Sequence, residues 1–307
     1  MKRIFFIILS VILGLVFIFS AYAKLFPVEL FELTLIDTGV SNWFLAPLLA
    51  RFFIGLEFFI GFMLISNIYM NRNILKLTIA IIIIFTIYLI ILIFIEGNEG
   101  NCKCFGNLIS LTPFESIIKN ILILLLSFLL YVKHAGFSWK FSKVFLSLIL
   151  IVSIPLPFIL NPVDLNASER NLNEEKLNYD LGLEILYNNP KVVQPKENLR
   201  TGKHIIAFIS LNCPHCRIGA YKMHIIKKRN SEIPIFFVLN GVEEDLQTFF
   251  DETKTSNIPY TILLGPEFVK RSGVKLPAIF WVEDGIVVRK TKYVYLEQKD
   301  IEEWIEN

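Results

Sequence analysis

Residues 211–220 read LNCPHCRIGA and hold two of the chain's four cysteines. The apolar run HIIAFIS at residues 204–210 comes immediately before them and is typical of a buried strand. A proline follows Cys213 directly, and proline suits the first turn of a helix because its missing N–H has no partner there. The stretch therefore predicts a strand that leads into a helix, with Cys213 at the junction.

Cys213 and Cys216 have the spacing of a thiol–disulfide exchange site. A cysteine at a helix N-terminus meets unpaired N–H groups and the helix dipole, which favour its thiolate. Cys216 is then placed to resolve a mixed disulfide, and His215 adds a partly cationic group that favours an oxidising disulfide. A static disulfide and half of a zinc site are the alternatives. Structural zinc takes four ligands, and neither His204 nor His224 completes a second pair, so we expect no metal.

The rest of the C-terminal region alternates between strand and helix patterns. Two apolar runs and a hairpin signal predict strands, and two amphipathic runs predict helices. In chain order these segments are IPIFFVLN at 233–240, VEEDLQTFFDETK at 242–254, PAIFWV at 277–282, GIVVRKT at 285–291 and LEQKDIEEWIEN at 296–307. With the opening strand and helix, the order is β-α-β-α-β-β-α, which predicts an α/β domain.

Residues 203–307 resemble the thioredoxin superfamily. The resemblance rests on the Cys-x-x-Cys motif and on VKLPAIFWV at residues 274–282, which matches the family's cis-proline segment. It implies that Cys213 attacks, that Cys216 resolves, and that Leu276 and Pro277 dock the substrate backbone opposite the cysteines. The family often has Trp before the first cysteine, where this chain has Asn212, so the redox potential is left open.

The first half of the chain is far more apolar than the second. Apolar residues make up 54% of the chain and are concentrated before residue 161. Segments of roughly 17–25 apolar residues are long enough to cross a bilayer. We expect spans at residues 4–22, 47–66, 74–95, 113–132 and 144–160. A polar, Asn-rich stretch at 161–200 reads as a linker to the α/β domain.

Basic residues between the predicted spans indicate how the chain is oriented. Lys and Arg cluster before the first span, between the second and third, and between the fourth and fifth, so these parts should be cytoplasmic. Cys102, Cys104 and everything after residue 160 then lie outside, in the periplasm of a bacterial inner membrane, where disulfides persist. Reading residues 1–23 as a cleaved secretory signal is an alternative that leaves this sidedness unchanged. Neither half has the dense basic patch that nucleic acid binding needs.

Apart from Lys76 at the edge of the third span, four charged residues fall inside predicted spans, where charges are costly and face a protein interior. They are Arg51, Glu57, Glu115 and Lys119. Glu115 and Lys119 are spaced to pair on one face of a helix. Two interpretations stay open for the group: structural ion pairs within the bundle, or a proton or quinone site near the outer cysteines.

Cys102 and Cys104 form a less common Cys-x-Cys pair between the third and fourth predicted spans. A disulfide across one residue closes a small, strained ring, and strained bridges are easily reduced. The pair is therefore interpreted as a redox-active membrane dithiol. Two unpaired loop thiols and a zinc site are the alternatives.

The membrane half resembles the MauE/DoxX family of small membrane bundles over roughly residues 4–132. The motifs that carry the resemblance are SAYAKLFP at 20–27, LLARFFIGLEFFIGFML at 48–64, CKCFGN at 102–107 and TPFESIIKNILIL at 112–124. The resemblance implies a four-helix bundle with the Cys-x-Cys segment at its outer end. MauE proteins are associated with maturation of a disulfide-rich methylamine dehydrogenase. The fifth span is an addition that returns the chain to the outside.

Together these patterns predict a multidomain membrane protein. An α-helical bundle at 1–160 and a linker at 161–200 precede a thioredoxin-like α/β domain at 201–307. The predicted function is a membrane-anchored thiol–disulfide oxidoreductase of the cell envelope that exchanges disulfides with client proteins, with oxidation favoured on His215. No covalently bound cofactor is expected, and a quinone or another membrane redox partner is a candidate electron partner. The alternative is a non-enzymatic assembly factor for an envelope enzyme of the methylamine dehydrogenase kind.

Overall fold

The computed structural model describes residues 2–68, 73–98, 111–134, 136–137, 140–163, 177–190 and 192–307. The chain divides into two compact units, Met1–Val163 and Asp164–Asn307, which are treated separately below. Cys102 and Cys104 lie outside the described residues, and so do residues 164–176 of the predicted linker.

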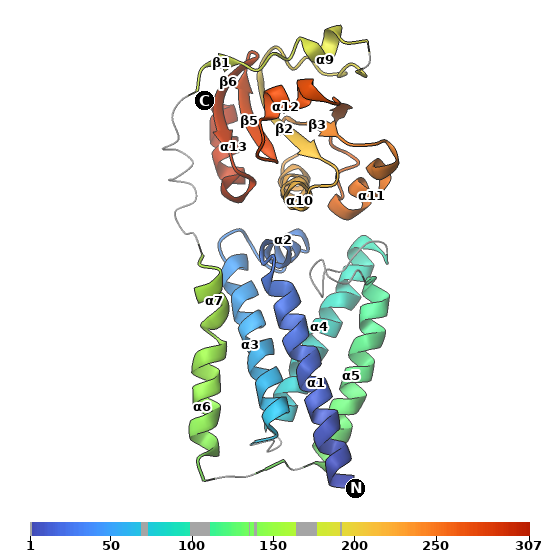
Figure 1. The fold of residues 1–307 in the computed structure, drawn as a ribbon, viewed down its shortest axis with the longest axis vertical. Coiled ribbons are helices and arrows are strands. Elements are labelled where there is room, and N and C mark those ends of the chain that lie inside the picture. Colours follow the sequence, from blue (N-terminus) through green and yellow to red (C-terminus); the bar gives the residue numbers. More distant parts are fainter. Residues whose placement is uncertain are drawn as a thin grey trace. The chain divides into compact units, whose positions relative to one another are not determined.

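The first unit is a bundle of helices (Figure 1). Its helices are α1 (Lys2–Leu25), α2 (Glu29–Asp37), α3 (Ala46–Ser66), α4 (Asn73–Glu96), α5 (Pro113–Lys133), α6 (Ser142–Ser153) and α7 (Leu156–Leu160). Five helical stretches are long and apolar enough to cross a membrane: Arg3–Leu25, Ala46–Ser66, Asn73–Phe94, Pro113–Lys133 and Ser142–Leu160. They coincide with the five predicted spans, and the chain is a multi-pass membrane protein.

Local sequence explains where several of these helices begin and end. Thr112 and Glu115 form a capping box at the start of α5, with Pro113 in the first turn. Asn67 ends α3 in a left-handed conformation with φ of 51°, which asparagine tolerates better than most residues. Pro155 separates α6 from α7 because proline has no N–H to continue the helical hydrogen bonds.

Helices α1 and α3 approach each other very closely at two glycines. A Cβ atom on Gly14 would lie 2.7 Å from the carbonyl oxygen of Gly61, and one on Gly61 would lie 3.0 Å from that of Gly14. Small residues at such a crossing let helix backbones approach within a membrane, where packing rather than the hydrophobic effect drives association. The crossing fixes α1 against α3, and the two helices lie side by side (Figure 1).

Hydrogen bonds identify which helix ends meet at each end of the bundle. At one end, Arg51 Nε donates to the carbonyl of Asn161 at 2.6 Å, and α2 lies across the ends of α1 and α3 (Figure 1). At the other end, His134 Nε2 lies 2.7 Å from Asn67 Oδ1, and the Arg3 guanidinium lies 4.8 Å from the ring centre of Phe137. Successive spans therefore run in opposite directions, as the charge pattern predicted.

The second unit is built on one mixed sheet with strand order β1-β6-β5-β2-β3-β4. The strands are β1 (Tyr179–Asp180), β2 (Lys203–Ser210), β3 (Ile235–Asn240), β4 (Tyr260–Ile262), β5 (Ala278–Glu283) and β6 (Ile286–Thr291). β2, β3 and β4 are parallel neighbours, whereas β5 is antiparallel to both β2 and β6. β2 is therefore a central strand, which explains why its apolar residues are buried on both faces.

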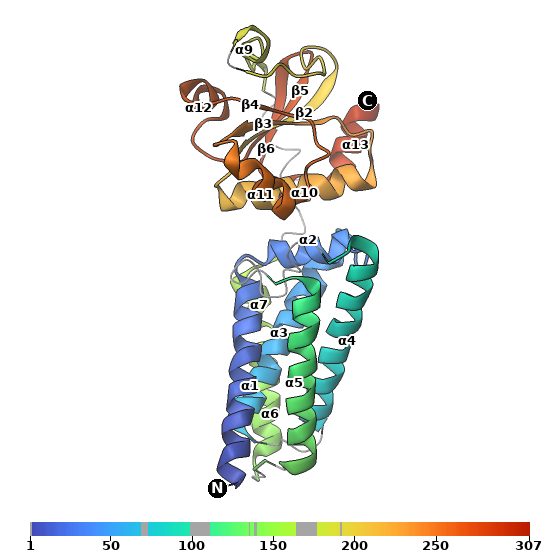
Figure 2. The ribbon, with the colours of Figure 1, turned by 90° about the vertical axis from the view of Figure 1, so that its right-hand side faces the viewer.

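Helices cover both faces of this sheet (Figure 2). They are α9 (Ile185–Asn188), α10 (Pro214–Arg229), α11 (Glu244–Thr253), α12 (Pro266–Ser272) and α13 (Gln298–Glu306), with the short 3-10 helix η1 (Tyr293–Tyr295). α9 and α12 pack with Phe208 and Phe280 in one apolar core, and α10 lies on the opposite face. The predicted order β-α-β-α-β-β-α is confirmed, with β1, β4, α9 and α12 as additions, and the unit has a thioredoxin-like fold.

The predicted linker at 161–200 needs a correction. Strand β1 pairs with β6, and Leu181, Leu186 and Leu199 are fully buried in the core of the α/β unit. The described residues from 177 onward therefore belong to that unit and are not part of a linker. The Asn-rich composition of this stretch indicated a linker, and it gave no sign that the leucines between the polar residues are buried.

Candidate redox site and the charged cluster of the bundle

Cys213 occupies the junction between β2 and α10, as predicted. It is the N-cap residue of α10, with extended backbone angles of φ −88° and ψ 120°, and Pro214 follows in the first turn. Its N–H donates to the carbonyl of Ser210 at 3.2 Å, and its own carbonyl accepts from Arg217 N–H at 3.2 Å. The thiol is partly exposed at the positive end of the helix dipole.

Cys216 lies one turn further along α10 and is fully buried. Burial raises the pKa of its thiol well above the ordinary range, and the neighbouring Cys213 raises it further. The N–H of Ser210, which lies 3.4 Å from Cys216 Sγ, opposes this effect but does not reverse it. Both cysteines are free thiols, so the pair joins one accessible sulfur to one that stays protonated at neutral pH.

The segment after β6 also contributes to the site around the two cysteines. Tyr293 of η1 places its hydroxyl 3.1 Å from Nδ1 of His215. A Cβ atom on Gly219 would lie 3.0 Å from Pro277 Cγ and 3.1 Å from Tyr293 Cβ, so all three residues meet beside α10. The Leu276–Pro277 peptide is cis, as the family resemblance implied. Sequence reasoning missed Tyr293, because it lies in a short connection that carries no motif.

Two further contacts hold the loop before Cys213, one to α11 and one to α10. Asn212 Nδ2 donates to Asp245 Oδ2 at 2.9 Å, and Arg217 Nε donates to the carbonyl of Leu211 at 3.0 Å. Arg217 also pairs with Glu252 of α11. The residue that replaces the family's usual tryptophan thus has a positioning contact of its own, which the sequence alone did not indicate.

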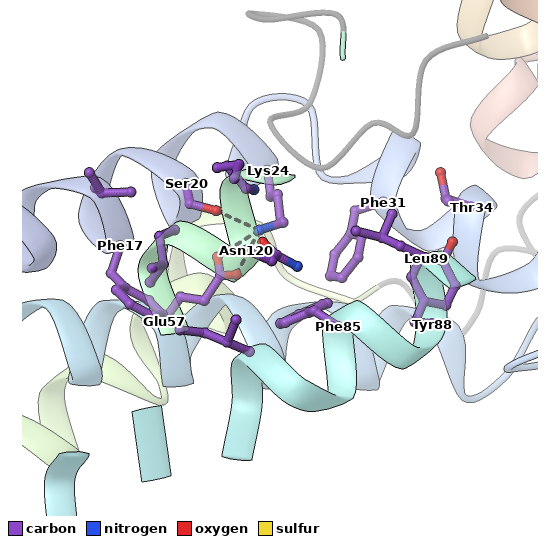
Figure 3. A pocket seen from close by; sticks show the side chains of 14 residues that line it. Phe17, Ser20, Lys24, Phe31, Thr34, Glu57, Phe85, Tyr88, Leu89 and Asn120 are labelled. Carbon is purple, nitrogen blue, oxygen red and sulfur yellow. Dashed lines mark hydrogen bonds and ion pairs between the residues drawn. The ribbon is translucent and has the colours of Figure 1, made fainter. Parts of the chain in front are cut away.

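The membrane half contains a buried ion pair, and the sequence predicted a buried position for only one of its two residues. Glu57 was expected to face the protein interior, and both of its carboxylate oxygens accept hydrogen bonds from Lys24 Nζ, at 2.6 and 2.8 Å (Figure 3). Lys24 Nζ also donates to Ser20 Oγ at 2.7 Å. The side chains of Lys24 and Glu57 are each only 5% exposed. The first predicted span ended at residue 22 and so left Lys24 in the outer loop that follows, whereas Lys24 lies in the last turn of α1.

The other predicted span charges have different surroundings. Arg51 is buried and pairs with Glu32 of α2, which ties α2 to α3. Glu115 is exposed and accepts from Thr112 N–H at 2.8 Å in the capping box. This places Glu115 among the backbone donors of the first turn of α5, and its predicted ion pair with Lys119 stays a prediction.

A cavity lies beside the Lys24–Glu57 pair, between α1, α2, α3, α4 and α5 (Figure 3). Lys119 and Asn120 of α5 also line it, so the structure brings Glu57 and Lys119 to one place, with Arg51 and Glu115 elsewhere. The remaining lining residues are mostly apolar or aromatic: Val16, Phe17, Ser20, Phe31, Thr34, Ile82, Phe85, Tyr88, Leu89 and Ile123. Among the described residues, no group of three His, Cys, Asp or Glu side chains is placed to hold a metal ion.

The predicted membrane dithiol, Cys102 and Cys104, lies outside the described residues. The residues that flank this part of the chain are close together, because Phe114 N–H donates to Asn98 Oδ1 at 2.9 Å. This contact joins the end of α4 to the start of α5 at the α2 end of the bundle (Figure 2). The role of the Cys-x-Cys pair therefore stays a prediction.

Comparison with known proteins found a family model, a relative and solved structures that are similar to parts of this chain. Residues 2–133 match the family model for methylamine utilisation protein MauE. Protein TlpB of Flavobacterium psychrophilum is 26% identical, over 83% of this chain and 82% of its own length.

Two similar solved structures are the thioredoxin domain of a thiol-disulfide oxidoreductase from Bacteroides vulgatus and a thiol:disulfide interchange protein from Bacteroides sp. The first is 18% identical and covers 35% of this chain and 81% of its own, with a TM-score of 0.29. The second is 19% identical and covers 36% and 76%, with a TM-score of 0.30. The match to the MauE model thus covers α1 to α5 of the first unit, and the Cys213–Cys216 pair lies in the second unit, outside that match.

Proposed function

We propose that this protein is a membrane-anchored thiol–disulfide oxidoreductase of the bacterial cell envelope. The observation that carries the proposal is the asymmetry of the Cys-x-x-Cys pair. Cys213 is partly exposed at the N-terminus of α10, whereas Cys216 is fully buried one turn later. A purely structural disulfide does not need one accessible sulfur at a helix N-terminus, but an exchange site does, because the attacked or attacking sulfur must be reachable.

The proposed reaction oxidises client proteins. A client thiolate attacks Cys213 in the Cys213–Cys216 disulfide, which forms a mixed disulfide and releases Cys216 as a thiolate. A second client thiolate then attacks the client sulfur of the mixed disulfide and releases Cys213. The client loses two electrons and two protons, and the pair gains both. Burial favours the protonated form of Cys216, so the released thiolate takes up a proton.

The surroundings of Cys213 suit this direction. The helix N-terminus stabilises the Cys213 thiolate of the reduced form, and a stabilised reduced form makes the disulfide a stronger oxidant. His215, held at hydrogen-bond distance from Tyr293, adds a polar group beside that sulfur. Leu276 and Pro277 would dock the client backbone, since Pro277 packs against Gly219 of α10, three residues after Cys216.

A second dithiol completes the proposed cycle. After each client oxidation the Cys213–Cys216 pair must lose two electrons and two protons before it can act again. We propose that Cys102 and Cys104 accept them through disulfide exchange, with both pairs on the non-cytoplasmic side. Support for this sidedness comes from the basic residues at the cytoplasmic ends, and support for a shared side comes from the alternating direction of the spans.

Trapping of mixed disulfides tests the proposal. Replacing Cys216 with Ala removes the resolving thiol, so Cys213 should accumulate client adducts that disappear on reduction. The Cys213→Ala variant, with Cys216 left buried, is the matched control and should trap none. If the Cys216→Ala variant traps no client in cells that carry the full chain, the exchange function is wrong. If a variant with serine at both positions supports normal assembly of envelope enzymes, the non-enzymatic assembly role holds instead.

A further inference from the structure

The cavity beside Lys24 and Glu57 has no part in the thiol chemistry of Cys213 and Cys216. It lies within the transmembrane bundle and has walls of two kinds. One wall is apolar and largely aromatic, with Phe31 and Phe85 among its residues (Figure 3). The other wall carries the Lys24–Glu57 ion pair together with polar side chains of α1 and α5 (Figure 3).

Stability alone does not explain the ion pair. Removing two charges from water is costly, and apolar residues of similar volume often replace a buried pair with equal or greater stability. Charges inside membrane spans are accordingly rare, and they mark functional sites more often than charges elsewhere. A buried pair that borders a cavity, instead of being enclosed by packed side chains, is best explained by a ligand that uses the polar wall.

The charge of the polar wall indicates what kind of ligand fits. Lys24 Nζ donates to both oxygens of Glu57 and to Ser20, so all three of its protons are engaged and the pair is neutral overall. The ammonium lies 5.4 Å from the ring centre of Phe85 and 5.8 Å from that of Phe31. Aromatic rings opposite a polar wall that carries N–H donors favour a planar ligand with acceptor oxygens.

We infer that this cavity binds the ring of a membrane-soluble quinone. The aromatic wall would contact the flat ring. Asn120 Nδ2 donates one of its two N–H groups to Thr86 Oγ1 at 3.2 Å, and its second N–H, with the Lys119 ammonium, would donate to the carbonyl oxygens of the ring. Quinone binding to the cavity does not depend on the thiol chemistry, whereas the role of the quinone as an electron acceptor rests on the proposed function. Each oxidised client leaves the protein with two electrons and two protons in a dithiol. A quinone that accepts both becomes a quinol, and the dithiol becomes a disulfide.

Photolabelling of the full chain in lipid nanodiscs tests the inference. The probe is an azido-substituted short-chain benzoquinone, with the unsubstituted quinone as competitor. We expect competable label on the segments of α1, α4 or α5 that line the cavity. Ile123→Phe places a larger side chain in the cavity and should lower competable labelling by about tenfold or more, the scale on which apolar pockets discriminate size. Leu122→Phe makes a comparable change at a neighbouring position that is 57% exposed and should label like the wild type.

A second variant tests the polar wall without leaving a charge unpaired. The double change Lys24→Met with Glu57→Leu keeps apolar volume in place of the pair, and its folding is checked by thermal unfolding. It should also lose competable labelling. Label that is spread over lipid-facing residues, or equal labelling of Ile123→Phe and Leu122→Phe, overturns the site. Loss of label in Ile123→Phe but not in the double variant shows a site for a lipid chain and overturns the quinone assignment.

Exchange of Cys213 with oxidised glutathione separates this inference from the proposed function. The cavity variants should keep the wild-type exchange rate, because glutathione does not need the membrane site. If labelling fails while this exchange is intact, only the quinone site is wrong. If labelling is competable and saturable while Cys213 does not exchange, the quinone site stands and the oxidoreductase function is wrong.

Discussion

Cys213 and Cys216 have the same chemistry in sequence and different surroundings in the fold. Cys213 is partly exposed at the start of α10, and Cys216 is buried against β2, with Ser210 N–H at 3.4 Å from its sulfur. Helical geometry explains the difference, because a residue three positions after an N-cap residue lies one turn further along the helix. The motif predicted this arrangement because all of its residues are contiguous.

Alkylation of the reduced protein should report the asymmetry. Burial raises the pKa of Cys216, and each unit of that rise lowers its thiolate fraction about tenfold at a fixed pH below the pKa. Near neutral pH, Cys213 should therefore react at least about tenfold faster than Cys216, as measured by mass spectrometry after timed alkylation. The rate at Cys216 should still rise with pH at the highest pH the fold tolerates. Equal rates in the folded protein would show that Cys216 is not buried, and the urea-unfolded chain is the control for equal reactivity.

The contact between His215 and Tyr293 predicts a shift in redox potential. If His215 stabilises the Cys213 thiolate, His215→Ala should make the Cys213–Cys216 disulfide less oxidising, by about 30 mV for each 1.4 kcal/mol of lost stabilisation. Tyr293→Phe removes only the hydroxyl and should shift the potential in the same direction by less. Equilibration with glutathione buffers measures both values. An unchanged potential in His215→Ala would remove the physical reason for favouring the oxidising direction.

The predicted spans agree with the helices because sustained apolar runs fix them, but hydropathy could not assign the charged residue at the end of α1. Lys24 was read as lying outside the membrane because a charge usually ends an apolar run. Its partner, Glu57, is far away in sequence and lies beside it only because α1 packs against α3. Long-range pairs of this kind, including Arg51 with Glu32, depend on helix packing that hydrophobic periodicity does not encode.

The close crossing of α1 and α3 can be tested by enlarging the side chain at Gly14. Gly14→Leu would place its Cβ atom 2.7 Å from the Gly61 carbonyl, so the helices must separate. We expect the bundle to lose about 1–3 kcal/mol of stability, as for other overpacked positions, seen as a lower unfolding temperature in detergent. Leu15→Phe adds volume on the same helix at a residue that is 55% exposed and should leave that temperature nearly unchanged. Equal effects of the two changes would argue against a close crossing.

At the scale of the whole molecule, the sequence predicted two units and their order, and each has the predicted kind of fold. The composition changes sharply near residue 160, which is close to the division between Val163 and Asp164. What the sequence could not assign is the stretch from 177 to 199, where short apolar segments join a sheet whose partner strand, β6, lies about a hundred residues later. The local sequence pattern predicts buried residues poorly where burial depends on pairing with a strand that is distant in the sequence.

Sidedness is testable with reporter fusions. A reporter that works only outside the cytoplasm should be active when it is fused after Asn307. The same reporter fused after Lys133, at the Arg3 end of the bundle, should be inactive, because this end carries the basic residues. The reverse pattern would place the Cys213–Cys216 pair in a reducing compartment and would contradict disulfide exchange in the envelope.

The relay between the two cysteine pairs is the central claim for the whole molecule, and one disulfide tests it directly. A chain that retains only Cys213 and one of Cys102 or Cys104 should form an intramolecular disulfide on mild oxidation. Tethering raises the effective concentration of the two thiols, so exchange does not need tight binding between the units. Cleavage at a protease site introduced within residues 164–176 should leave the two halves joined until they are reduced. If neither combination forms a reducible link while both thiols react freely with alkylating reagents, the two pairs do not exchange electrons directly.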